Sequence, residues 1–112
     1  MRAVCLFVII GGVLLAAPVA AGDAAQVEKG KAVFTAQKCS LCHSIAGKGN
    51  PKGALDSVGT KLKPEEIRQW LVKPTEMAEK AKATRKPPMK AYDKLSKDEL
   101  DALVAYLETL KK

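Results

Sequence analysis

The hydrophobic positions of this chain recur at helical rather than strand spacing. Ile67, Trp70 and Leu71 stand at positions i, i+3 and i+4, which predicts a helix that begins at Pro64 and ends near Val72. Proline suits the first helical position, because the amide hydrogen that it lacks would have no partner there. No segment shows sustained alternation of hydrophobic and polar residues, so the predicted fold class is all-α.

A clearer helix is predicted at the C-terminal end. Ser96 and Glu99 have the spacing of a capping box, in which each side chain accepts a hydrogen bond from the other residue's backbone amide. An apolar stripe at helical spacing follows, made of Leu100, Leu103, Val104 and Leu107.

The first helix is predicted from about Asp23, as N-cap, to Cys39. Gly30 lies within its apolar stripe, although a glycine inside a helix costs about 1 kcal/mol relative to alanine. Close approach of another helix would explain this glycine, and a tolerated surface glycine is the alternative.

The middle of the chain has weaker patterns. Residues 44–63 are predicted to be a loop, because four glycines and a proline interrupt them. Residues 75–84 are predicted as a short helix capped by Thr75, and Pro87-Pro88 predicts an extended stretch.

Residues 3–22 carry no charge and follow Arg2. The apolar run and the small residues that end at Ala21 have the layout of a secretory signal peptide. We therefore predict a signal peptide at residues 1–21, a mature domain at residues 22–112 and a periplasmic location. A retained membrane anchor is the alternative, because about 18 uncharged apolar residues can span a bilayer.

The most informative motif is Cys39-Ser40-Leu41-Cys42-His43, the C-x-x-C-H pattern of c-type haem attachment. Each cysteine thiol can add to one haem vinyl group, and the histidine beside them can ligate the iron. A zinc site or a redox pair is the alternative, but a structural zinc site needs about four protein ligands. Outside the first 21 residues the chain has no other cysteine and no other histidine. We predict one haem c, attached through Cys39 and Cys42.

A second axial ligand would have to come from Met77, Met89 or, less favourably, a lysine. Met89 follows two prolines that hold its backbone, whereas Met77 lies in a predicted helix, where methionine more often fills the core. We therefore predict His43 and Met89 as the metal ligands. Such a six-coordinate iron passes single electrons and has no vacant position for a substrate.

These residues resemble the class I cytochrome c family, in its small bacterial monohaem form. The resemblance covers essentially the whole predicted mature chain. It implies three to four helices wrapped around one covalently attached haem, with the N- and C-terminal helices crossing. It also implies that Gly30 and Phe34 meet the last helix near Leu103 and Tyr106.

The resemblance implies two further haem-binding residues. Trp70 is similar to the haem-pocket tryptophan of the family, and a plain core aromatic is the alternative. Many members place a proline carbonyl against the ring N–H of the ligating histidine, and Pro51 is the nearest candidate for it. Residues 53–55 could fill the same space. Lys90 stands where many members have a proline.

The positive charge of the chain is concentrated in one region. Residues 44–90 carry 11 basic and 5 acidic side chains, a net charge of +6. A basic rim around the haem edge would steer redox proteins with acidic docking surfaces, and ordinary solubilising charge is the alternative. Nucleic acid is not an expected partner, and a monomer is expected.

The predicted function is a one-electron carrier of a respiratory or related redox chain, and not an enzyme. One alternative is a membrane-tethered redox subunit of a larger oxidoreductase, with residues 3–22 retained. Another is a haem enzyme that acts on peroxide or nitric oxide, which would need Met89 absent from the iron.

Overall fold

The computed structural model describes residues 11–12 and 23–112. The predicted signal peptide, residues 1–21, therefore lies outside the described residues except for Gly11 and Gly12, and it stays a prediction. Among the described residues, no helix combines the length and the hydrophobicity that a membrane span requires.

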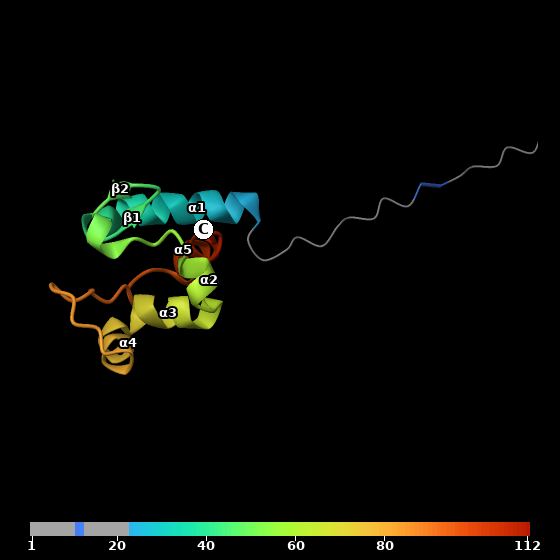
Figure 1. The fold of residues 1–112 in the computed structure, drawn as a ribbon. Helices are drawn as coiled ribbons and strands as arrows, with labels where there is room; N and C mark the ends of the chain where they lie inside the picture. The colour runs from blue at the N-terminus through green and yellow to red at the C-terminus, as the bar shows by residue number, and fades with distance from the viewer. Residues whose placement is uncertain (1–10, 13–22) are drawn as a thin grey trace, which may run out of the picture.

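The described residues form a mainly helical fold (Figure 1), which confirms the all-α prediction. Its only described sheet has two strands of two residues each. The elements in chain order are α1 (Ala24–Ala36), a 3-10 turn (Cys39–Leu41), β1 (Ser44–Ile45), β2 (Lys48–Gly49), a second 3-10 turn (Pro51–Gly53), α2 (Val58–Lys61), α3 (Pro64–Val72), α4 (Pro74–Ala81) and α5 (Lys97–Glu108).

Helix α1 ends three residues earlier than its apolar pattern predicts. Lys38 has a left-handed backbone, with φ of 56°, and no α-helix continues through such a residue. The next residues turn in a 3-10 helix at Cys39–Leu41. Similarly, α4 ends before the left-handed Lys82, and it begins at Pro74 rather than at Thr75.

The prediction of a loop over residues 44–63 is wrong in part. β1 and β2 pair as an antiparallel hairpin, whose turn residues Ala46 and Gly47 have φ of 52° and 79°. Helix α2 follows, and its four residues are too few to give a periodic pattern.

Gly30 lies where α1 crosses α5, as the resemblance implies. A Cβ atom at Gly30 would overlap the backbone carbonyl oxygen of Ala102 and would stand 2.6 Å from the Cβ of Tyr106. Phe34 meets Tyr106 edge to face, with ring centroids 5.9 Å apart. The glycine therefore permits close contact of the terminal helices and is not a tolerated surface residue.

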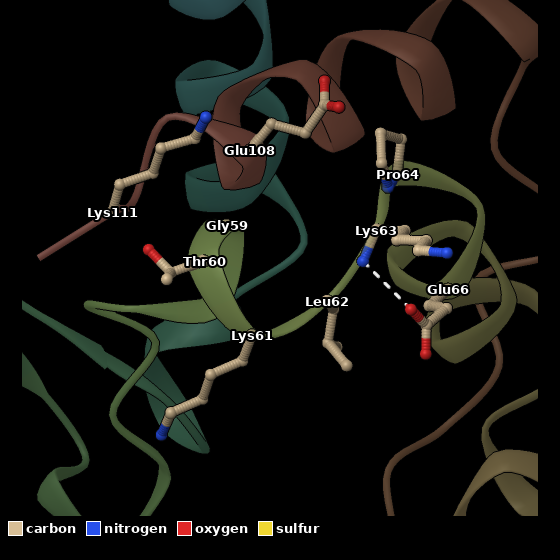
Figure 2. Close-up of a pocket in the computed structure, with 9 residues that line it drawn as sticks. All are labelled: Gly59, Thr60, Lys61, Leu62, Lys63, Pro64, Glu66, Glu108 and Lys111. Carbon is tan, nitrogen blue, oxygen red and sulfur yellow. Dashed lines mark hydrogen bonds between the residues drawn. The ribbon is translucent and has the colours of Figure 1, made fainter.

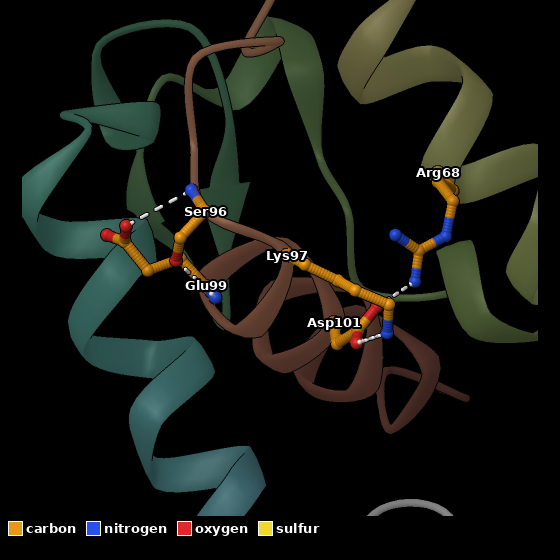
Figure 3. A network of polar contacts seen from close by, with 5 residues as sticks. All are labelled: Arg68, Ser96, Lys97, Glu99 and Asp101. Atoms are coloured by element: carbon orange, nitrogen blue, oxygen red, sulfur yellow. Dashed lines mark hydrogen bonds and ion pairs between the residues drawn. The ribbon is translucent and has the colours of Figure 1, made fainter.

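The hydrophobic core is small and is built from three helices. Its buried cluster consists of Val33, Ile67, Leu71, Leu103, Val104 and Leu107, which come from α1, α3 and α5. The capping box of Ser96 and Glu99 starts α5 as predicted, with the Glu99 amide 3.1 Å from the Ser96 hydroxyl (Figure 3).

One carboxylate ties α3 to α5. Asp101 accepts hydrogen bonds from Arg68 of α3 and from Lys97, whose Nζ lies 2.9 Å away (Figure 3). These two cations hold the pKa of the Asp101 carboxyl below its usual value. The Asp101 carboxyl is therefore ionised at neutral pH.

Candidate functional site

The C-x-x-C-H motif folds into one compact turn. The Cys39 carbonyl accepts hydrogen bonds from the amides of Cys42, at 3.1 Å, and of His43, at 2.9 Å. Both cysteines are free thiols, one buried and one exposed. Burial raises the pKa of the Cys39 thiol. The turn thus places two unpaired thiols and an imidazole on five consecutive residues.

The ring of His43 is oriented by a backbone carbonyl of the second 3-10 turn. Its Nδ1 lies 3.0 Å from the carbonyl oxygen of Gly53. The predicted partner, Pro51, is therefore wrong by two residues, because the turn at Pro51–Gly53 directs its last carbonyl, and not its first, toward the ring. The alternative at residues 53–55 is the one that the structure contains.

This hydrogen bond also fixes the tautomer of His43. A carbonyl can only accept, so Nδ1 carries the proton and Nε2 keeps its lone pair. Burial lowers the pKa of the imidazole; the Gly53 carbonyl opposes that shift, and the charge of Arg85 adds to it. A neutral imidazole with a free Nε2 is the form that binds a metal.

Asn50 stabilises the backbone of the motif through hydrogen bonds, a role that its residue type alone does not predict. Its amide lies 3.1 Å from the carbonyl oxygens of both Ser40 and His43, and its side-chain nitrogen lies 3.2 Å from the Leu41 carbonyl. The residue before it, Gly49, has φ of 110°, and a Cβ there would overlap the His43 carbonyl. Asn50 and Gly49 thus fix the backbone that carries the thiols and the imidazole.

A segment more than 40 residues away in sequence also reaches the motif. Arg85 Nη2 donates to the carbonyl oxygen of Cys42 at 2.5 Å, and the Tyr92 side chain lies near enough to the Cys39 thiol to affect its pKa. Burial raises the pKa of the Tyr92 hydroxyl. The fold therefore brings the segment that contains Met89 to the attachment turn.

The two candidate methionines differ in their surroundings. Both are half-buried, but Met89 packs against the core cluster, whereas Met77 is not among the described residues that do so. Trp70 is half-buried on α3, and it too is missing from the described residues that pack on the cluster. The roles of Met89 as a ligand and of Trp70 as a haem-pocket residue stay predictions.

Two cavities of the described residues contain no residue of this turn. A cavity of about 400 Å³ is lined by α2, by the first turn of α3 and by the end of α5 (Figure 2). Its polar side chains include Glu66, which accepts the Lys63 amide at 3.1 Å and so caps α3. A second cavity of about 310 Å³ lies between the starts of α1 and α5. Neither contains a residue of the motif.

Comparison with known proteins identifies the family of the chain. The family model described as Cytochrome c matches residues 27–111. The chain belongs to the cytochrome c family. A search of curated proteins and a search of solved structures each gave no match. Members of the cytochrome c family bind haem covalently through cysteine and transfer electrons, so membership assigns the chain to haem-based electron transfer.

The donor set of this cytochrome c family member fits haem c. Two free thiols in one turn match the two vinyl groups, and the imidazole beside them has Nε2 available for iron. The zinc alternative has no support, because no group of three His, Cys, Asp or Glu side chains that could hold a metal ion occurs within residues 11–12 and 23–112.

Proposed function

We propose that this protein is a one-electron carrier with a single haem c, attached through Cys39 and Cys42 and ligated by His43 and Met89. The observation that carries the proposal is the hydrogen bond from His43 Nδ1 to the Gly53 carbonyl, which leaves Nε2 free to bind iron in the same turn as two free thiols. Bound haem c supplies a reversible Fe(II)/Fe(III) couple. The protein contributes ligands, a partly dry site and a docking surface.

Ligation by Met89 decides between electron transfer and substrate chemistry. A thioether sulfur is a soft ligand, and with histidine it raises the reduction potential of haem iron. With both axial positions filled by His43 and Met89, no position remains for peroxide or nitric oxide. The packing of Met89 against the core cluster supports this assignment, because it holds the side chain on the inner side of its segment.

We expect Met89→Ala to abolish the weak red-region absorption band that sulfur-to-iron charge transfer gives in the oxidised protein. Met77→Ala is the matched control and should keep the band, because Met77 lies on α4 and is not assigned to the iron. Absorption spectra of both variants, made together with haem-attachment machinery, provide the measurement. Loss of the band in Met77→Ala alone would overturn the ligand assignment.

We propose that redox partners with acidic surfaces dock at the attachment turn. Leu41, between the two cysteines, is 69% exposed, which makes it a large apolar side chain at the surface. Basic residues lie near the same turn: Lys52 precedes Gly53, Arg85 contacts Cys42, and Lys90 lies near enough to Cys39 to affect the pKa of its thiol. An apolar centre with a basic rim fits an acidic partner surface.

We expect the bimolecular electron-transfer rate with an acidic redox protein to fall at least about tenfold between low and high ionic strength. Lys52→Glu should lower the rate at low salt and flatten this dependence. Lys111→Glu makes the same charge reversal at the cavity of Figure 2, which contains no residue of the motif, and should have a much smaller effect. Stopped-flow kinetics give both rates, and a salt-independent rate in the unmodified protein would remove the steering role.

We also propose export to the periplasm, with cleavage after Ala21. The uncharged residues 3–22, which follow Arg2, support this proposal. Thioether formation also needs reduced thiols and haem outside the cytoplasm. The mass of the mature protein distinguishes a cleaved, diffusible carrier from a membrane-tethered subunit that retains these residues.

A further inference from the structure

The segment from Arg85 to Tyr92 contacts the attachment turn at both of its ends. At the first end, Arg85 Nη2 donates to the Cys42 carbonyl at 2.5 Å, across 43 residues of sequence. Within the described residues, no backbone amide outside the regular elements donates to that carbonyl. The guanidinium therefore supplies a partner for a polar group that lies next to His43.

Gly53 provides the space for the guanidinium. A Cβ atom at Gly53 would overlap both Arg85 Nη1 and the Cys42 carbonyl oxygen, and it would stand 2.9 Å from His43 Nδ1. Arg85 therefore lies close against the same glycine whose carbonyl orients the His43 ring. The turn at Pro51–Gly53 therefore both orients the imidazole of His43 and contacts Arg85 of the distant segment.

At the second end, the backbone of Tyr92 is held by α3, and its side chain lies near the attachment turn. The Tyr92 amide donates to the Leu71 carbonyl of α3 at 2.7 Å, and the Tyr92 side chain lies near enough to the Cys39 thiol to affect its pKa. Lys90 Nζ lies 5.2 Å from the centroid of the Tyr92 ring, within the range of a cation–π contact. In the sequence, Met89 lies between Arg85 and Tyr92, the two residues that bring the segment to the turn.

We infer that Arg85 is a positioning residue for the iron site: its guanidinium ties the Met89 segment to the Cys42 carbonyl and so slows the departure of the Met89 sulfur from iron. The inference rests on the proposed ligation by His43 and Met89. Methionine has a flexible side chain, so the position of its sulfur depends on how firmly its backbone is held. A charge-assisted hydrogen bond at one end of a short segment restricts that backbone.

The charge of Arg85 has a separate consequence. Its guanidinium bonds to the carbonyl of Cys42, the residue next to His43, so the positive charge lies beside the proposed ligand. A positive charge there disfavours Fe(III) relative to Fe(II), since oxidation adds one positive charge at the iron. Arg85 therefore raises the reduction potential as well as holding the segment.

The test is exchange of the axial methionine for added imidazole, measured on the oxidised holoprotein. Imidazole can bind only after the sulfur has left the iron. We expect Arg85→Gln to bind imidazole about five- to tenfold faster than the unmodified protein, the effect of one lost charge-assisted hydrogen bond in a partly exposed setting. Its reduction potential should also fall. Arg85→Lys keeps the charge, so its potential should stay near that of the unmodified protein.

The matched control is Lys82→Gln, which removes an equal charge three residues before Arg85, outside the segment from Arg85 to Tyr92. It should leave the exchange rate unchanged. If Arg85→Gln and Lys82→Gln exchange equally fast while both keep covalent haem, the inference is wrong. Failure of the proposed ligation looks different, because the unmodified protein would then lack the sulfur-to-iron band or keep it in Met89→Ala.

Discussion

We expect the double variant Cys39→Ala, Cys42→Ala to lose covalent haem and, with it, cooperative thermal unfolding. The buried cluster of the described residues has six members, and Leu103 is the one large side chain among them with less than 2% of its surface exposed. A domain of about 90 residues buries a modest fraction of its surface and has little stability to spare. Haem would add a large apolar surface to this small core, and without it the protein should be poorly folded.

The measurement is circular dichroism during heating, with covalent haem followed by absorption. Leu41→Ala provides the matched control, because it changes an exposed residue between the two cysteines and leaves both thiols in place. It should retain haem and unfold cooperatively. A haem-free double variant with a sharp unfolding transition would show that the protein core is sufficient on its own.

The elements that could be predicted from sequence are those in which local and tertiary preferences agree. Helix α5 has a capping box and an apolar stripe, and α3 has Pro64 at its first position and two glutamates in its first turn. Both match the structure closely. The crossing of α1 with α5 needed the family resemblance, because Gly30 alone is equally compatible with an exposed helix surface.

The details of the site were harder to predict from sequence, because they depend on the direction of backbone groups and not on side-chain type. Every residue has a carbonyl, so no pattern distinguishes Gly53 from Pro51 as the partner of His43; the 3-10 turn makes that choice. Asn50 acts largely through its backbone amide. Arg85 is one of 11 basic residues between positions 44 and 90, and the sequence does not predict its contact with Cys42, which crosses 43 residues.

Gly30→Ala is expected to destabilise the protein strongly, although alanine is the better helix former. On an exposed helix surface this change should stabilise by up to about 1 kcal/mol. At the crossing, the new methyl group would overlap the Ala102 carbonyl oxygen and crowd Tyr106 Cβ. Overpacking of this kind costs about 1–3 kcal/mol, and more where a backbone must move. We therefore expect a net loss of about 2 kcal/mol or more in the free energy of unfolding.

Whether Gly30→Ala lowers or raises the free energy of unfolding tests the crossing of α1 with α5. Denaturant unfolding of the holoprotein measures this change. Lys29→Ala, at the neighbouring exposed position of α1, is the matched control and should change the stability by less than about 0.5 kcal/mol. A more stable Gly30→Ala would mean that the two helices do not meet here. Because the nearest atom is a backbone oxygen, no smaller side chain on α5 can relieve the overlap. Only a shift of the whole helix can, and that shift would break the edge-to-face contact of Phe34 with Tyr106.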